Sequence, residues 1–86
     1  MKDTTITNLK ITKKQSPYSD YFIIYNNDDQ NAYFVFKNNI KNKLLWNDLE
    51  SKETDIKKIW VEYEETEKGY KVINFDILET NNDTDF

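Results

Sequence analysis

The chain lacks the residues on which many catalytic and metal sites depend. Its 86 residues contain no cysteine and no histidine, which excludes disulfides, thiolate nucleophiles, imidazole bases and imidazole metal ligands. The glutamates of "VEYEETE", residues 61–67, fall on a predicted strand and turn. A carboxylate there lacks the burial that tunes such a group for acid–base catalysis. The sequence therefore predicts a non-catalytic protein with no metal and no cofactor.

Long apolar runs are also missing. No stretch approaches the roughly 18 apolar residues of a membrane-spanning helix, and the opening "MKDTTITNLK" is too polar for a secretory signal. We therefore expect a cytoplasmic protein without a membrane partner. The length is that of one domain. Aromatic residues make up 15% of the chain and can supply its core, for which we select Phe22, Phe34, Phe36 and Phe75.

Arginine is absent, so all 12 basic residues are lysines, and the net charge is −4. Bidentate reading of guanine favours arginine, whereas lysine suffices to contact phosphates along a nucleic-acid backbone. The charge is unevenly placed, because residues 79–86 hold three of the 16 acids (Glu79, Asp83 and Asp85) and no lysine, which leaves 13 acids against 12 lysines. We predict one nearly neutral domain over 1–78 and an acidic C-terminal tail over 79–86.

Apolar alternation predicts five strands. Pro17 and Gly69 are the single proline and glycine, and each separates two predicted strands. The helical spacing of Ile40, Leu44 or Leu45, and Leu49 predicts one helix at about 40–50, with Asn39 as its N-cap. Ile6 breaks the alternation of the first strand, which indicates a bulge or a later start. The predicted strands are 5–13, 20–26, 31–37, 56–65 and 70–78.

Alternation also assigns side chains to faces. In 31–37 we place Phe34 and Phe36 on one face and Tyr33, Val35 and Lys37 on the other. In 56–65, Trp60 lies opposite the apolar face. In 70–78, one face is predicted to carry Lys71, Ile73, Phe75 and Ile77. Gly69 is expected to supply the positive φ of a hairpin loop.

The order strand, strand, strand, helix, strand, strand is typical of the OB-fold. That fold is a small five-stranded Greek-key barrel with one helix between strands three and four. A small α+β sheet with one covering helix would give the same order. Many OB-folds bind single-stranded nucleic acid, and they contact it through strands two and three and the flanking loops.

Single-strand binding requires flat rings on which bases stack and cations that follow the backbone. The loop and strand positions of the predicted barrel that carry such residues form our candidate nucleic-acid site. Two of its rings also suit a core position, and its paired lysines also suit a solvated loop. The candidates are Lys10, Lys13, Lys14, Tyr18, Tyr21, Tyr33, Lys37 and Trp60.

The last residues, "TNNDTDF", carry a resemblance. Asp83, Asp85 and Phe86 form an acidic tip closed by an aromatic residue, which resembles the C-terminal tails of bacterial and phage single-stranded DNA-binding proteins. The isoleucine-proline pair and the long linker of that family are absent here. The resemblance implies a body that coats single-stranded DNA and a tail that recruits replication or repair proteins, and it allows a homo-oligomer. The abundance of lysine, asparagine and isoleucine suggests a low-GC bacterium or its phage or mobile element.

A second hypothesis is a small acidic inhibitor that mimics DNA and binds a host nucleic-acid enzyme. Its acidic stripe would combine Glu62, Glu64, Glu65, Glu67, Asp76 and Glu79. Lysines clustered around exposed Tyr33 and Trp60 would favour the coat protein, and a continuous carboxylate face with those two rings buried would favour the mimic.

Overall fold

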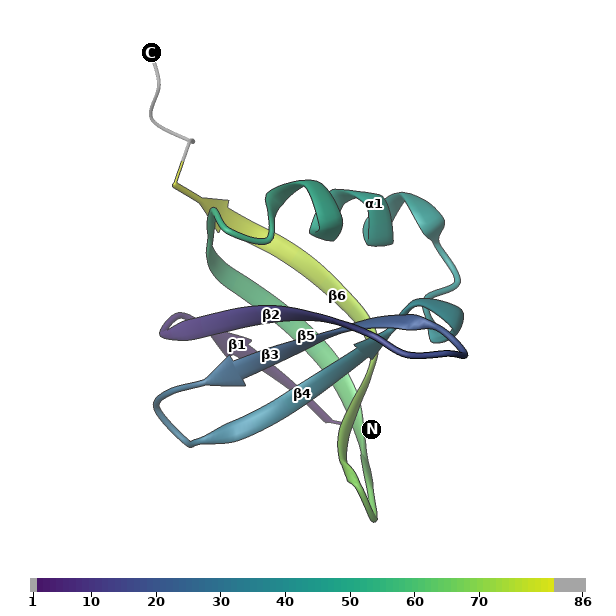
Figure 1. The fold of residues 1–86 in the computed structure, drawn as a ribbon. Helices are drawn as coiled ribbons and strands as arrows, with labels where there is room; N and C mark the ends of the chain where they lie inside the picture. The colour runs from purple at the N-terminus through teal and green to yellow at the C-terminus, as the bar shows by residue number, and fades with distance from the viewer. Residues whose placement is uncertain (1, 82–86) are drawn as a thin grey trace.

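The structure, a computed structural model, describes residues 2–81, which form six β-strands, one 3-10 helix and one α-helix (Figure 1). Asp83, Asp85 and Phe86 lie outside the described residues. The prediction of a mostly β domain with a single α-helix is confirmed. The elements are β1 (Lys2–Ile6), β2 (Leu9–Gln15), β3 (Asp20–Asn26), β4 (Asn31–Phe36), η1 (Lys37–Asn39), α1 (Lys43–Lys52), β5 (Ile56–Thr66) and β6 (Gly69–Thr80).

All six strands belong to one sheet, in the order β1-β5-β6-β4-β3-β2. Neighbouring strands are antiparallel except β4 and β6, which are parallel where Tyr33 pairs with Tyr70 and Phe34 with Lys71. The strands at the two edges, β1 and β2, do not pair with each other within residues 2–81, so the sheet is not closed into a barrel. Figure 1 shows α1 across one end of the curved sheet and the β5–β6 hairpin projecting from the opposite end.

The predicted first strand, residues 5–13, is two strands. The chain leaves the sheet at Thr7 and Asn8, so that β1 pairs with β5 while β2 pairs with β3. Ile6 and Leu9 both reach the core from either side of this interruption, which explains why Ile6 departs from the alternation. The interruption gives six strands in place of the predicted five, and it places α1 between the fourth and fifth.

The α-helix begins later than predicted. Asn39, the expected N-cap, belongs instead to the short 3-10 helix that follows β4. Asn42 caps α1, because its side-chain oxygen accepts a 3.0 Å hydrogen bond from the backbone N–H of Leu44. Asparagine is a favoured N-cap residue, so both Asn39 and Asn42 were suitable. The spacing of the apolar residues did not decide between them.

One hydrophobic core lies between the inner face of the sheet and α1. Trp46 of α1 packs against Phe22 of β3, with ring centroids 4.9 Å apart. The predicted core positions of Phe22 and Phe75 are confirmed. The buried apolar residues are Ile6, Phe22, Ile24, Tyr33, Val35, Ile40, Trp46, Leu49, Ile56, Ile59, Val61, Val72 and Phe75.

The division of β4 into two faces is as predicted for Tyr33, Phe34, Val35 and Phe36, but the assignment of Phe34 and Phe36 to the core is wrong. Tyr33, only 2% exposed, and Val35 point into the core, while Phe34 and Phe36 lie half-buried on the outer face. Every residue from Ala32 to Phe36 is apolar or aromatic, so alternation defines two faces without choosing the inner one. The choice is made by pairing, because Val35 lies opposite the buried Phe22 of β3.

The predicted face of β6 is also corrected. Val72 is buried and lies opposite Tyr63, whereas Asn74 lies opposite Glu62, so Ile73 is an extra residue in the strand. Such a bulge shifts the alternation by one residue. At the start of β6, Gly69 has a φ of 128°, as predicted for the hairpin.

Candidate functional site

On the outer face of β2, β3 and β4, the residues that pair between neighbouring strands form three rows across the sheet. Lys14, Tyr21 and Phe36 form the first row of laterally paired residues. Thr12, Ile23 and Phe34 form the second, and Lys10, Tyr25 and Ala32 form the third. Because side chains alternate across a strand, these nine residues share one side of the sheet. We call this surface the β2–β4 face.

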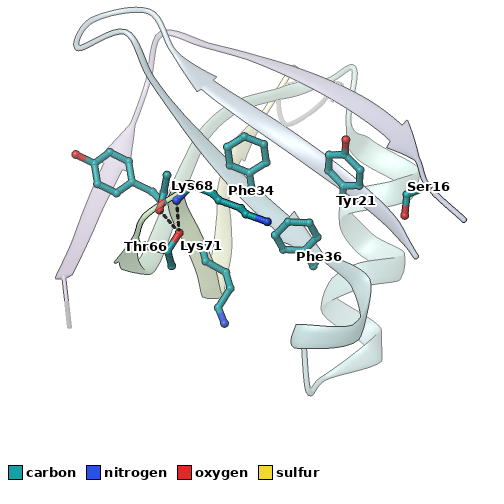
Figure 2. A pocket seen from close by; sticks show the side chains of 9 residues that line it. Ser16, Tyr21, Phe34, Phe36, Thr66, Lys68 and Lys71 are labelled. Carbon is teal, nitrogen blue, oxygen red and sulfur yellow. Dashed lines mark hydrogen bonds between the residues drawn. The ribbon is translucent and has the colours of Figure 1, made fainter. Parts of the chain in front are cut away.

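An open pocket of about 410 Å³ occupies one end of this face (Figure 2). The rings of Phe34 and Phe36 are nearly parallel, at 13°, with centroids 6.2 Å apart, and the Tyr21 ring lies 5.3 Å from that of Phe36. In Figure 2 the three rings lie side by side. We call this the aromatic pocket; it is lined by Ser16, Tyr21, Phe34, Phe36, Thr66, Lys68, Gly69, Tyr70 and Lys71.

Two short loops border the aromatic pocket, and side-chain hydrogen bonds order both. Between β2 and β3, the Ser16 hydroxyl donates to the carbonyl of Ser19 and accepts from the N–H groups of Tyr18 and Ser19. In the β5–β6 hairpin, the Thr66 hydroxyl donates to the carbonyl of Gly69 at 2.8 Å. The first loop holds the ring of Tyr18 in solvent, 91% exposed. Such ordering lowers the entropy lost when a ligand binds.

The aromatic pocket has two cationic side chains in its lining. Lys68 and Lys71 contribute to its lining, which contains no carboxylate. The side chain of Lys68 extends toward Phe34 and Phe36 (Figure 2). Flat rings beside ammonium groups suit a ligand that is planar and anionic, because the rings offer stacking surfaces and the lysines offer charge.

Three of the residues predicted from the sequence lie on the β2–β4 face, namely Lys10, Lys14 and Tyr21. Tyr18 lies in the loop next to Ser16 of the aromatic pocket. Lys37 follows Phe36 directly and is exposed in η1. The structure thus brings together part of the predicted site, with Tyr21 on the expected second strand and Lys10 and Lys14 on the strand before it.

Lys13 lies on the opposite side of β2 from Lys14. Its ammonium group donates a 2.8 Å hydrogen bond to the Glu50 carboxylate of α1. This bond raises the pKa of Lys13 and lowers the pKa of Glu50. Lys13 therefore joins β2 to the helix and is removed from the candidate site.

Two predicted rings do not reach the aromatic pocket. Tyr33 is a core residue whose ring lies 5.1 Å from Tyr63 and 5.2 Å from Tyr70, and burial raises its pKa to about 12. Trp60 lies on β5, and its indole N–H donates a 2.8 Å hydrogen bond to Asp3 of β1. Because β6 separates β5 from β4, Trp60 belongs to a different surface.

Sequence reasoning missed Phe34, Phe36, Lys68, Lys71 and Tyr25. The two phenylalanines were assigned to the core, and the two lysines border the hairpin, which was treated only as a turn. Signals for Lys68 and Lys71 were present, since the loop between strands four and five of an OB-fold contacts ligand. No sequence signal distinguished Phe34 from Tyr33, because both lie in a strand that is apolar on both faces.

The predicted acidic stripe is interrupted by lysines. Glu65 forms an ion pair with Lys2 at 2.5 Å, and Glu79 forms one with Lys58 at 3.5 Å. Glu64 lies directly opposite Lys71. Three of the six carboxylates therefore lie beside a lysine, whereas Glu62 lies opposite Asp3 of β1 and Asn74 of β6.

Comparisons with known proteins returned no matching family model, no matching curated protein and no matching solved structure. Among residues 2–81, no helix combines the length and the apolar character needed to cross a membrane.

Proposed function

We propose that this chain binds single-stranded nucleic acid, with DNA as the expected ligand, and performs no catalysis. The observation that carries this proposal is the aromatic pocket, in which the rings of Tyr21, Phe34 and Phe36 lie beside Lys68 and Lys71 without a carboxylate. Bases of any sequence stack on such rings, and ammonium groups neutralise the phosphates. A duplex keeps its bases stacked internally, so these rings favour a single strand.

The strand order supports an OB-fold-like interpretation of the same surface. If β1 and β2 are counted as one interrupted strand, the sheet contains five strands, and this first strand lies at both edges. The OB-fold is a partly open five-stranded barrel with that property. Strands two and three are then β3 and β4, and the aromatic pocket lies between the two loops through which OB-folds contact ligand. Position in the fold and chemistry of the lining thus favour one ligand class.

Adjacent lysines on opposite faces of β2 provide a matched test. We expect Lys14→Gln to weaken binding of a fluorescein-labelled oligothymidylate and to reduce the slope of log K against log salt by about 0.7, the value for one phosphate contact with a single strand. Lys13→Gln makes the same change of charge one residue away, on the inner side of β2. We expect it to leave the slope unchanged. Fluorescence anisotropy at several salt concentrations measures both.

Equal slopes for the two lysine variants would contradict the assignment of the β2–β4 face. Because Lys13→Gln breaks the ion pair with Glu50, thermal unfolding of both variants is the control for folding. Equal losses of slope would indicate that only the overall charge attracts the oligonucleotide.

Recruitment of replication or repair proteins by Asp83, Asp85 and Phe86 is a separate proposal that rests on the sequence resemblance. A ring flanked by two carboxylates suits an apolar pocket with a basic rim. We expect the triple variant Asp83→Asn, Asp85→Asn, Phe86→Ala to retain oligonucleotide affinity and to lose partners captured by the full chain. Unchanged capture in a pull-down followed by mass spectrometry would contradict this role.

The DNA-mimic hypothesis has less support. A mimic presents carboxylates at the spacing of phosphates, whereas Glu64, Glu65 and Glu79 each lie beside a lysine. The exposed rings of the aromatic pocket have no part in that hypothesis. We therefore do not adopt it.

A further inference from the structure

A second cleft lies on the β2–β4 face, outside the aromatic pocket. It has a volume of about 450 Å³, and it contains Tyr25, whose side chain is 38% exposed. Lys10 lies directly opposite Tyr25 in the strand register, and Lys14 borders the same cleft. The lining contains no carboxylate; it consists of Lys10, Thr12, Lys14, Ile23, Tyr25 and Asn27.

The two clefts are parts of one continuous surface. Ile23 lines the second cleft and lies directly opposite Phe34 of the aromatic pocket. Tyr21 and Tyr25 are four residues apart on β3, which places them about 13 Å apart along the strand. Lys14 and Lys10, their partners on β2, have the same separation. A tyrosine of β3 beside a lysine of β2 therefore occurs twice on this face, at positions about 13 Å apart along the strands.

Both lysines are available to a ligand. In the part of the chain that the structure describes, neither Lys10 nor Lys14 takes part in an ion pair. This differs from Lys13, which Glu50 neutralises. The exposed ammonium groups and the exposed ring of Tyr25 are complementary in charge and shape to an anionic chain of planar bases.

We infer that Tyr25 and Lys10 form a second stacking subsite, occupied by the continuation of the strand held in the aromatic pocket. This inference rests on the proposed function and extends it. The bound strand then runs along β3, from the loop at Ser16 toward the β3–β4 turn. A ligand too short to span both clefts occupies only the aromatic pocket, which offers the adjacent rings of Tyr21, Phe34 and Phe36 rather than one ring.

Ligand length separates the two subsites experimentally. We expect Tyr25→Ala to weaken binding of a labelled oligothymidylate of about 12 nucleotides by fivefold or more, the lower end of the effect of one stacked base. Tyr25→Phe keeps the stacking surface and should restore the affinity. Lys10→Gln should reduce the salt slope by about 0.7. In an NMR titration of the wild-type chain, a thymidine dinucleotide should shift the amide signals of Phe34 and Phe36 but not that of Tyr25.

Three outcomes would overturn the subsite. The first is a Tyr25→Ala chain that binds the longer oligonucleotide as tightly as the wild type. The second is a Tyr25→Phe chain that loses as much affinity as Tyr25→Ala. The third is an equal response of Tyr25 and Phe34 to the dinucleotide. If the wild-type chain binds neither oligonucleotide, the proposed function itself fails, which is a different result from a strand that binds only in the aromatic pocket. Tyr25 is exposed, so truncation is expected to leave the fold intact, and urea unfolding checks this.

Discussion

Replacing Phe34 and Phe36 together by alanine is expected to reduce the affinity for a single-stranded oligonucleotide by about 30-fold or more. Each base stacked on an aromatic side chain contributes about 1–3 kcal/mol, and the double variant removes two of the three rings that lie side by side in the aromatic pocket. The remaining Tyr21 ring would lose the neighbour that lies 5.3 Å away. Fluorescence anisotropy with a labelled oligothymidylate measures the change.

The control for the double phenylalanine variant is Trp60→Ala. Trp60 is a larger ring on the outer side of β5, hydrogen-bonded to Asp3 and separated from β4 by β6. Its truncation should leave the oligonucleotide affinity of the folded chain within about twofold of the wild-type value. A folded Phe34→Ala, Phe36→Ala chain with wild-type affinity would contradict the assignment of the aromatic pocket. Far-UV circular dichroism and urea unfolding establish that the chains are folded.

Phe22→Ala is expected to have the largest effect on stability. Phe22 is fully buried, packs against the Trp46 ring at 4.9 Å and lies between Lys13 of β2 and Val35 of β4. Truncation of a buried phenylalanine costs about 3–5 kcal/mol. A domain of this length has a total free energy of unfolding of about 4–13 kcal/mol. The variant should therefore lose a large fraction of the wild-type free energy of unfolding, as measured by urea denaturation monitored by tryptophan fluorescence.

A conservative change at the same position provides the comparison. Phe22→Leu keeps most of the buried volume and should cost less than the alanine variant. Phe36→Ala, at a half-buried site, should also cost less, because the removed ring was still partly in water. An unfolding midpoint of Phe22→Ala equal to that of wild type would contradict the placement of α1 against β3.

The fold was predictable where one local signal dominated. Gly69 marked a hairpin because its φ of 128° is rare for other residues. Trp60 and its neighbours on β5 alternated cleanly between one polar and one apolar face. The interruption at Thr7 and Asn8 was visible only as the misplaced Ile6, because the sequence does not say that the two halves pair with different strands. Long-range pairing of this kind leaves little local trace.

The candidate site was predictable in its location but not in its rings. Tyr21 was selected because it occupies the second strand of the predicted OB-fold, and Lys14 because it falls in the predicted loop before that strand. Lys10 was selected as a cation on the first strand. Phe34 was assigned to the core and Tyr33 to either environment, and the structure reverses this preference. Hydroxyl groups usually mark the outer residue of a strand, but the ring of Tyr33 packs among other tyrosines in the interior. The face of β4 that points into the core is set by the residues of β3 with which it pairs. The periodicity of the sequence does not specify this pairing.

An NMR titration of the ¹⁵N-labelled chain with an unlabelled oligothymidylate at low salt tests the central claim most directly. We predict that shifted amide signals will concentrate on residues 10–25, 31–37 and 66–71, and that they will return toward their free positions as salt is added. Signals on β1 and on the first half of β5 should stay unchanged. An unchanged spectrum at millimolar oligonucleotide, or shifts confined to β1 and β5 around Trp60, would contradict a nucleic-acid interface on the β2–β4 face.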